Sequence, residues 1–210
     1  MKRRVGSMEY DLFKRIIDQV GEHVDLVYIA GGLGEPTLHK RLGEMITYAR
    51  VAGVRVGLST NATLLNPGIC QTIFDARPDL ILLSLDGATK EIHEKIRVGS
   101  NFEKTMSKVE YFLREKHLKN LKQLYTIVQM IFMSENKIEM DSFRKRWLSH
   151  KGINEIRMKK YIHLQGASEY PENSSAVINN QYKSCILPWR QISISWDGKV
   201  SICCRDLDYT

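Results

Sequence analysis

Apolar and polar residues follow two different rhythms along this chain. Helical spacing of apolar residues predicts helices over about 8–20, 38–51, 89–96, 102–116 and 138–149. A further helix is predicted to begin at Asn66 and Pro67, as its N-cap and first residue. Between them lie short apolar runs of strand length, at 26–30, 54–60, 79–87, 124–133 and 153–161. This alternation indicates right-handed βαβ units, and so an α/β fold with a parallel sheet or barrel.

The two ends of the chain do not follow this rhythm. The first predicted element is a helix, as though the strand before it were missing. Residues 163–184 have no clear period, which predicts a linker. After the linker, "ISISWDGKVSI" alternates around Asp197 and Gly198, which predicts a hairpin with a two-residue turn. That pairing sets Trp196 opposite Lys199 and Ile192 opposite Cys203. The chain stops soon afterwards, and both ends look cut.

Composition and charge narrow the function only modestly. The formal net charge is +7, with 43% hydrophobic and 26% charged residues, which is typical of a globular protein. Basic residues alternate with acidic ones along the helical segments, and the densest clusters, at 2–4 and 144–146, are short. A solvated surface is the first interpretation, and an anionic substrate or cofactor the second. Nucleic-acid binding is disfavoured, because the predicted hairpin offers only Trp196 and Lys199 as an aromatic and basic pair.

No segment of the sequence resembles a membrane or export signal. The first residues, "MKRRVGSMEYDLFKR", contain no apolar stretch of the signal-peptide kind. No apolar run approaches the roughly 18 residues that span a bilayer. A cytoplasmic location is therefore predicted, where cysteines stay reduced and serve metals or chemistry more often than disulfides.

A glycine-rich loop follows the first predicted strand, in "LVYIAGGLGEPTLHKRL" (26–42). Glycine allows close approach of a ligand to the backbone, and a helix start directs free N–H groups toward it. The dinucleotide-binding pattern begins at Gly32 and Gly34, but Thr37 stands where its last glycine should be. The Lys of a phosphate-binding P-loop is also missing. Either a ligand loop of another kind or an ordinary strand-to-helix turn fits these residues.

Polar residues also follow the other predicted strands. Ligands in βα folds bind at the carboxyl ends of the strands, so these residues predict a polar small molecule there. Asp86 could hold a ribose hydroxyl, or it could cap the helix that begins near Thr89. Arg97 could pair with a ligand carboxylate, or it could be a surface residue. The strand-end residues are Ser59, Thr60, Asn61, Ser84, Asp86, Gly87, Ser134 and Asn136.

The four cysteines fall into two groups. Cys70 lies on the apolar side of a helix and is predicted to be a core residue. Cys185, Cys203 and Cys204 lie in the C-terminal segment. Neighbouring strand residues point to opposite faces, so at most one of the last two would readily join Cys185 at a shared metal. Two ligands are too few for a closed zinc or iron–sulfur site, so free buried thiols remain the alternative. His39 is predicted to be structural.

Three of these segments together resemble the radical S-adenosylmethionine (radical SAM) superfamily. "GGLGEPTLH" is similar to that family's GGEP loop, whose backbone holds the methionine amino group of the cofactor. "LSTNATLL" is similar to its S/T-N-G element, with Ala62 in place of the usual glycine. "LLSLDGATKEIHEKIRVGSNF" is similar to its S-L-D-G strand end and the arginine that follows.

The C-terminal segment resembles a SPASM or twitch domain of the same superfamily. "CILPWRQISISWDGKVSICCRD" is similar to the first half of the SPASM pattern, with Cys185, Gly198 and Cys203 at matching positions. The resemblance therefore implies a partial (β/α)6 TIM-like barrel missing its first strand, followed by the beginning of a SPASM-type hairpin. The implied domains are the barrel at 1–162, a linker at 163–184 and the truncated SPASM domain at 185–210.

The resemblance also implies cofactors and the residues that hold them. In such enzymes a reduced [4Fe-4S] cluster cleaves S-adenosylmethionine, and the resulting 5′-deoxyadenosyl radical abstracts a hydrogen from the substrate. Cys185 and Cys203, with Cys204 as a third candidate, would ligate an auxiliary cluster. The methionine part would be bound by Gly32, Gly34, Glu35 and Pro36, the ribose side by Thr60, Asn61, Ser84 and Asp86, and the carboxylate by Arg97.

One departure from the family pattern is large. The C-x-x-x-C-x-x-C motif that holds the catalytic cluster is absent from these 210 residues. In relatives it lies just before a segment like "MKRRVGSMEYDLF", so the expected explanation is that the sequence begins after it. The chain as given would then be the inactive central part of an enzyme. The alternative is a noncatalytic, degenerate barrel that binds a nucleotide-like or anionic ligand.

The resemblance implies partners only as classes. The substrate would be a peptide, a sugar or another small molecule, and an electron donor such as flavodoxin or ferredoxin would reduce the cluster. No membrane partner is expected.

Overall fold

The computed structural model describes residues 5–30, 34–161, 185–203 and 206. The chain divides into two units, one formed by Phe13–Tyr161 and the other by Met1–Leu12 with Ile162–Thr210. Each unit is described by itself.

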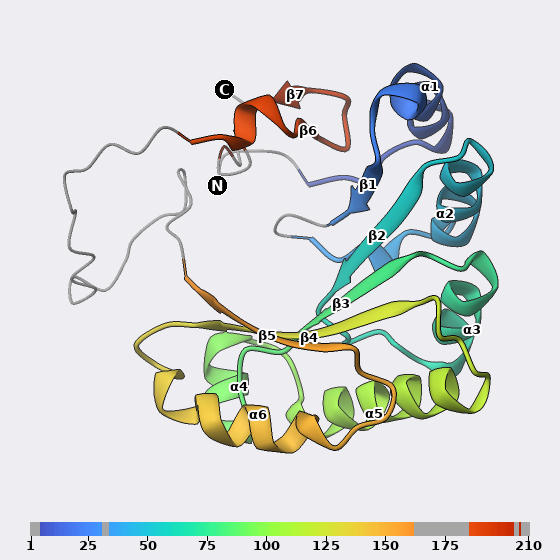
Figure 1. Ribbon diagram of the computed structural model, residues 1–210. Coiled ribbons are helices and arrows are strands. Elements are labelled where there is room, and N and C mark those ends of the chain that lie inside the picture. Colours follow the sequence, from blue (N-terminus) through green and yellow to red (C-terminus); the bar gives the residue numbers. More distant parts are fainter. Residues whose placement is uncertain (1–4, 31–33, 162–184, 204–205, 207–210) are drawn as a thin grey trace. The chain divides into compact units, whose positions relative to one another are not determined.

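A five-stranded parallel sheet forms the centre of the larger unit (Figure 1). Its strands lie in chain order, and each pairs with the next one in the sequence. This strand order is typical of a barrel wall. In a doubly wound sheet, the order of the strands would reverse part-way across the sheet. The strands are β1 (Leu26–Ile29), β2 (Arg55–Thr60), β3 (Leu80–Ser84), β4 (Tyr125–Phe132) and β5 (Glu155–Lys160).

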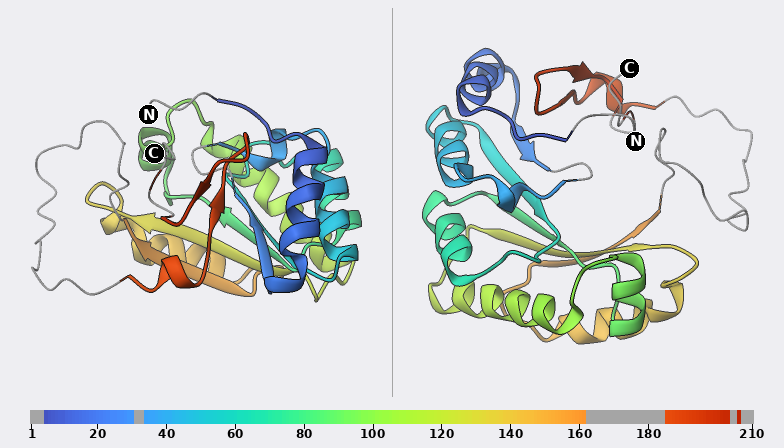
Figure 2. Two further views of the ribbon diagram at one scale, coloured as in Figure 1. Left: turned by 90° about the horizontal axis from the view of Figure 1, so that it is seen from above. Right: turned by 180° about the vertical axis from the view of Figure 1, so that it is seen from behind.

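Helices cover the outer face of this curved sheet, and the inner face is concave (Figure 2). The predicted partial (β/α)6-type barrel is therefore confirmed. The helices of the chain are α1 (Tyr10–Val20), α2 (Leu42–Val51), α3 (Pro67–Ala76), α4 (Lys90–Ile96), α5 (Phe102–Leu118) and α6 (Met140–Leu148), with short 3-10 turns η1 (Gly21–His23), η2 (Pro36–Leu38) and η3 (Lys137–Glu139).

The core lies between the sheet and the helices. Alternate strand residues on the outer face, such as Leu58, Leu83 and Val128, are fully buried. Helices α5 and α6 supply the largest buried side chains of this layer, including Phe112 and Trp147. Burial of this apolar layer is the main stabilising contribution, at roughly 1.5–3 kcal/mol for each large side chain.

Local sequence signals explain most helix boundaries. Asn66 caps α3, because its side-chain oxygen accepts a hydrogen bond from Ile69 N at 2.9 Å, as predicted. Thr89 caps α4 and Asn101 caps α5 in the same way. The predicted start of the second helix at Leu38 is wrong by four residues. Residues Pro36–Leu38 form η2 instead, and the backbone of His39 is extended before α2 begins at Leu42.

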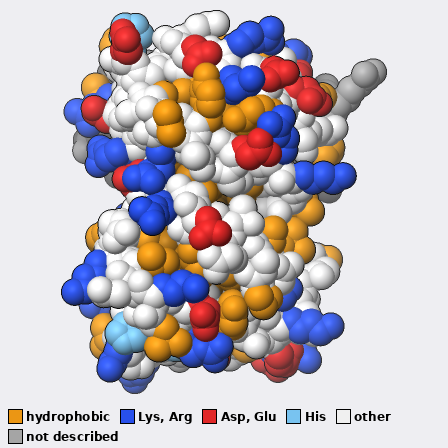
Figure 3. Space-filling view, turned by 90° about the vertical axis from the view of Figure 1, so that its right-hand side faces the viewer, with side chains coloured by type: hydrophobic (Ala, Val, Ile, Leu, Met, Phe, Trp, Pro, Cys, Tyr) orange, Lys and Arg blue, Asp and Glu red, His pale blue; other side chains and the backbone are white. Residues whose placement is uncertain are grey.

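Charged side chains are distributed over the surface rather than gathered. Figure 3 shows one face, on which basic and acidic side chains alternate. This agrees with the solvated surface predicted from the sequence. None of the helices in the described residues is long and apolar enough to cross a membrane.

The smaller unit contains a short hairpin of β6 (Ser193–Ile194) and β7 (Val200–Ser201), preceded by η4 (Leu187–Trp189). The two-residue turn predicted at Asp197 and Gly198 is wrong. Ser193 pairs with Ser201, and Ser195 N donates to Lys199 O, so the loop has three residues. Gly198 adopts φ 84°, the left-handed conformation that closes such a loop. The pairing is therefore shifted by one residue, and Ile192 is not opposite Cys203.

Candidate functional site

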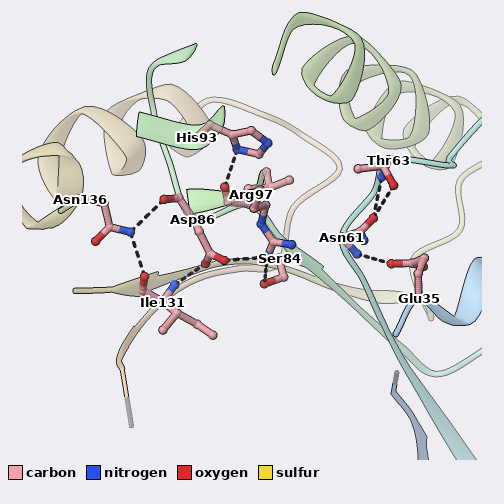
Figure 4. A network of polar contacts seen from close by, with 10 residues as sticks. Glu35, Asn61, Thr63, Ser84, Asp86, His93, Arg97, Ile131 and Asn136 are labelled. Carbon is pink, nitrogen blue, oxygen red and sulfur yellow. Dashed lines mark hydrogen bonds and ion pairs between the residues drawn. The ribbon is translucent and has the colours of Figure 1, made fainter. Parts of the chain in front are cut away.

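Polar residues from several strands meet at the carboxyl-terminal edge of the sheet (Figure 4). Figure 4 shows two groups of them, one around Glu35 and Asn61 and the other around Asp86 and Arg97. Parallel strands end at the same edge, which is why residues far apart in sequence come together here.

Glu35 joins the loop after β1 to the end of β2. Its carboxylate accepts hydrogen bonds from Thr60 Oγ1 and Asn61 N, both at 2.7 Å. It also accepts from Thr37 N at 3.0 Å and Thr37 Oγ1 at 2.6 Å, which caps η2. Four donors on one carboxylate make Glu35 an anchor for the loop, while Gly34 and Pro36 flank it in the chain. Gly32 lies outside the described residues.

The end of β2 turns sharply after Thr60. Ala62 adopts φ 64°, a left-handed conformation that favours glycine, and it occupies the position where the family pattern has glycine. Thr60 Oγ1 accepts from Ala62 N at 3.0 Å, and Asn61 Oδ1 accepts from Thr63 N at 3.0 Å. The Asn61 side chain therefore stabilises its own turn.

Arg97, Asp86 and Ser84 form the second group. Arg97 Nη2 donates to Asp86 Oδ2 at 2.7 Å and to Ser84 Oγ at 2.8 Å. The other Asp86 oxygen, Oδ1, accepts from Ile131 N at 2.8 Å. Asp86 does not cap the following helix, because Thr89 does so. Arg97 is not an ordinary surface residue, since its side chain is only 22% exposed and its Nε is buried without a partner.

The loop that carries Asp86 is held by residues that follow β4. Asp86 adopts φ 44°, and its carbonyl accepts from Asn136 Nδ2 at 2.9 Å. Asn136 is completely buried, and its Oδ1 accepts from Met133 N at 2.7 Å. Glu139 accepts from Ala88 N at 2.7 Å and from the Thr89 hydroxyl. Sequence reasoning noted Asn136 only as a strand-end residue and missed Glu139, although an amide and an acid just after a strand are a usable signal.

His93 packs beneath the same loop. It is fully buried, and its Nδ1 lies 2.8 Å from Leu85 O, while Nε2 has no partner among the described residues. Burial lowers the pKa of His93 below its ordinary value, and the charge of Arg97 acts in the same direction. The imidazole is therefore neutral near pH 7 and supports the loop by packing.

Of the described cysteines, one is buried and two are exposed. Cys70 is 1% exposed and burial raises the pKa of its thiol to about 12, which confirms the predicted core role. Cys185 and Cys203 are exposed free cysteines, and Cys204 lies outside the described residues. The part of the chain that the structure describes contains no group of three or more potential metal ligands. His39 Nδ1 accepts from Arg41 N at 3.1 Å.

Comparison with protein families gives a match to the Radical SAM superfamily over residues 1–144. Among curated proteins, the chain is 38% identical over 82 residues to the tungsten-containing aldehyde ferredoxin oxidoreductase cofactor-modifying protein of Pyrococcus furiosus, covering 39% of this chain and 23% of that protein. It is 32% identical over 101 residues to mycofactocin maturase MftC of Mycobacterium ulcerans, covering 48% of this chain and 27% of that protein.

The fold is also found among solved structures. Streptococcus suis SuiB bound to its precursor peptide SuiA aligns with a TM-score of 0.62 at 15% identity, covering 77% of this chain and 35% of SuiB. At this identity the likeness concerns the fold alone. The matched segments span about a quarter of the length of the two curated relatives.

Proposed function

This chain belongs to the radical SAM superfamily, and we propose that it is the central part of an enzyme that modifies a peptide or another small molecule by radical chemistry. Membership confirms the resemblance drawn from the sequence motifs. It also implies S-adenosylmethionine and a [4Fe-4S] cluster as cofactors. When bound, S-adenosylmethionine would supply the radical chemistry, and the residues of this chain would position and shield the reactants.

Arg97, which follows α4 and contacts Ser84 at the end of β3, carries this proposal. Arg97 is mostly buried and has an Nε donor without a partner, so it can donate a hydrogen bond to a further anionic group beside Asp86. An arginine fork matches a carboxylate, which is the group carried by the methionine part of S-adenosylmethionine. The residues present therefore fit this cofactor.

We assign the other polar residues at the carboxyl-terminal edge of the sheet to the remaining parts of the cofactor. Glu35 anchors the described part of this loop, and to the loop residues Gly32, Gly34, Glu35 and Pro36 we assign the binding of the methionine part. On the ribose side we assign Thr60, Asn61, Ser84 and Asp86. Two of the four acceptor positions of the Asp86 carboxylate are already used, by Arg97 and Ile131 N, which leaves capacity for a ribose hydroxyl.

The catalytic cluster does not fit the residues of this chain. The four cysteines of the chain are dispersed over the sequence, and no three of them have the C-x-x-x-C-x-x-C spacing. We therefore assign no residue of this chain to the catalytic cluster. An auxiliary cluster held by Cys185, Cys203 and Cys204, within a SPASM-type segment at 185–210 that follows a linker at 163–184, remains a proposal. Reduced thiols and cluster chemistry suit the cytoplasm, and a flavodoxin or ferredoxin would supply electrons.

The relatives indicate the kind of substrate. One is named a maturase of mycofactocin, and SuiB was solved with a precursor peptide. A peptide substrate is therefore our first proposal for this chain. A noncatalytic ligand-binding barrel is the second, supported by the missing cluster motif. Upstream coding sequence with an in-frame C-x-x-x-C-x-x-C would favour the enzyme, and a first strand without cysteines would favour the binding protein.

Binding of S-adenosylmethionine tests the proposed site directly. We expect Arg97→Gln to weaken binding about tenfold, because a charge-assisted contact to a carboxylate is lost. Arg55→Gln is the matched control, since Arg55 lies exposed at the opposite end of β2. Equilibrium dialysis with the 210-residue chain measures both, and circular dichroism checks that the variants fold. Equal affinities in the two variants would remove Arg97 from the cofactor site.

A further inference from the structure

A groove of the larger unit lies away from the candidate cofactor site. Its walls are one face of α5 and the turn that follows α6, which lie side by side (Figure 1). Its volume is about 520 Å³, within the ~300–1,000 Å³ of typical small-molecule sites. The turn leads into β5, so the groove lies near the amino-terminal edge of the sheet. The candidate cofactor site is at the opposite, carboxyl-terminal edge.

The turn after α6 approaches α5 closely at Gly152. An added Cβ on Gly152 would lie 2.6 Å from Leu113 O, in the backbone of α5. The same turn is tied to α5 by Lys116, whose Nζ donates to Gly152 O at 2.8 Å and to Asn154 Oδ1 at 2.7 Å. The walls of the groove are therefore held in place before any ligand binds, which lowers the free-energy cost of binding.

Basic side chains line both walls of the groove. Helix α5 contributes Arg114 and His117, and the turn contributes His150 and Lys151. An arginine fork and a lysine ammonium bind phosphate oxygens, and an imidazole can add a further N–H donor. The side chains that line the groove therefore favour an anionic ligand.

The positive charge of the groove is not balanced by acidic residues of the chain. Glu110, the acid among the described residues that line the groove, already accepts from Arg146 Nη2 at 3.0 Å. Glu115 approaches Arg114 only to 3.5 Å, and an exposed ion pair of this kind contributes little. No carboxylate of the described residues pairs with Lys151. Arg114 and Lys151 therefore present about two positive charges to a ligand.

A buried cation lies directly behind the wall of the groove. Lys116 is 5% exposed, and both groups that accept hydrogen bonds from its ammonium among the described residues are neutral. Gly152, whose carbonyl is one of these acceptors, lines the groove. Because a buried charge without a counter-charge is costly, an anion in the groove would offset part of this cost.

We propose that this groove binds a small molecule through its phosphate group, as a second ligand site separate from the cofactor site. Two positive charges match the roughly −1.5 to −2 charge of a phosphate monoester near pH 7. The guanidinium of Arg114 is oriented by the ring of Tyr111, whose centroid lies 5.3 Å from it. The ring of His150 packs against that of Trp147, with 5.1 Å between the centroids.

The dipoles of the two helices are the other explanation for these basic residues. His117 lies in the last turn of α5 and His150 just after α6, where positive charge is favourable. This effect falls off within the last turn of a helix. It therefore does not explain Arg114, which lies a full turn before the end of α5. Arg144 and Lys145 offer a direct comparison, since both are exposed on α6 and neither lines the groove.

Titration with inorganic phosphate tests the proposal. The 210-residue chain, in a buffer without phosphate, is followed by amide proton–nitrogen NMR spectra at constant ionic strength. Sodium phosphate is added up to about 50 mM, well above the ~1 mM dissociation constants of weak sites. We expect the signals of residues 114–117 and 150–152 to shift together and to saturate. A response no larger than that to sodium chloride at the same ionic strength would overturn the site.

Variants with matched controls locate the binding. Arg114→Gln and Lys151→Gln should each weaken phosphate binding about tenfold, because each removes a charge-assisted contact. Arg144→Gln and Lys145→Gln remove the same charges from α6 and should leave the affinity unchanged. Equal phosphate affinity in Arg114→Gln and Arg144→Gln would overturn the site.

Two further titrations define the group that is bound and its independence from the cofactor. Sodium acetate, a monoanion, should bind more weakly than phosphate, and equal affinities would overturn the assignment of a phosphate group. Arg114→Gln should bind S-adenosylmethionine like the wild type, because the two sites lie at opposite edges of the sheet. Loss of S-adenosylmethionine binding in this variant alone would contradict a separate second site.

Discussion

The absence of a side chain at Gly87 allows the loop that carries Asp86 to pack closely against α4. A Cβ at this position would lie 2.7 Å from the backbone N and Cα of His93, in helix α4. Backbone atoms of a helix cannot move aside as the end of a flexible side chain can. Close packing of the loop carrying Asp86 against α4 therefore requires glycine here.

We expect Gly87→Ala to lower the free energy of unfolding by about 1–3 kcal/mol, because the loop must move away from α4. Gly68→Ala is the control, since an added Cβ there would meet its nearest neighbour at 3.4 Å, an ordinary contact. Urea unfolding of both variants measures the difference. A Gly87→Ala variant as stable as the control would show that the loop adapts without cost.

Lys116 is a buried lysine held by neutral groups. Its Nζ donates to Gly152 O at 2.8 Å and to Asn154 Oδ1 at 2.7 Å, and the residue is 5% exposed. Burial lowers the pKa of Lys116 from 10.5 to about 8. The unfolded chain therefore binds one more proton than the folded chain between these two pH values, and folding becomes more favourable as the pH rises through this range.

We expect Lys116→Met to remove this pH dependence. The free energy of unfolding of the wild type, relative to this variant, should increase on the order of 2 kcal/mol between pH 8 and 10.5. Lys119→Met, at the exposed end of α5, should show no such change. Chemical unfolding at several pH values makes the comparison. Parallel pH profiles for the wild type and Lys116→Met would contradict the assignment.

At the scale of elements, segments about 50 residues apart brace one another. The turn before α6 holds the loop before α4, through Asn136 to the Asp86 carbonyl and Glu139 to Ala88 N and Thr89. Both loops end at the same edge of the sheet because β3 and β4 are paired in parallel. The position of Asp86 thus depends on residues that never touch its carboxylate.

We expect Glu139→Gln to lower the free energy of unfolding by about 1–2 kcal/mol, because hydrogen bonds to a charged acceptor become bonds to a neutral one. Hydrogen exchange in residues 88–96 should accelerate, since the loop and α4 lose their anchor. Glu91→Gln, on the exposed side of α4, should have little effect. Unchanged exchange in this segment would show that Glu139 is dispensable for the loop.

At the scale of the whole molecule, the chain has the proposed cofactor site at the carboxyl-terminal edge of its sheet. It has no C-x-x-x-C-x-x-C group to hold the catalytic cluster. We therefore expect the 210-residue chain, supplied with iron, sulfide and a chemical reductant, to bind S-adenosylmethionine without cleaving it reductively. Chromatographic measurement of 5′-deoxyadenosine checks this, with a relative that contains the cluster motif as the positive control. Formation of 5′-deoxyadenosine by this chain would contradict the expectation.

Much of the architecture was predictable because it depends on local patterns. The apolar period located the five strands and most helices to within a few residues, and Asn66 correctly predicted the cap of α3. Errors fell where local signals compete. Glu35 caps a 3-10 turn that delays α2, and Gly198 closes a three-residue loop that resembles a two-residue turn in sequence.

The candidate site divides in the same way. The sequence by itself determined that polar residues follow each strand, since alternating strands and helices bring those ends to one edge. Only the tertiary structure decided their partners, which are Asp86 for Arg97 and Thr60 for Glu35. Hydrogen bonds form over about 3 Å, so they depend on strand register and loop path to a fraction of a residue. The period of apolar residues does not predict contacts at this distance, because it indicates which face of a strand or helix a residue occupies and not which residue it contacts.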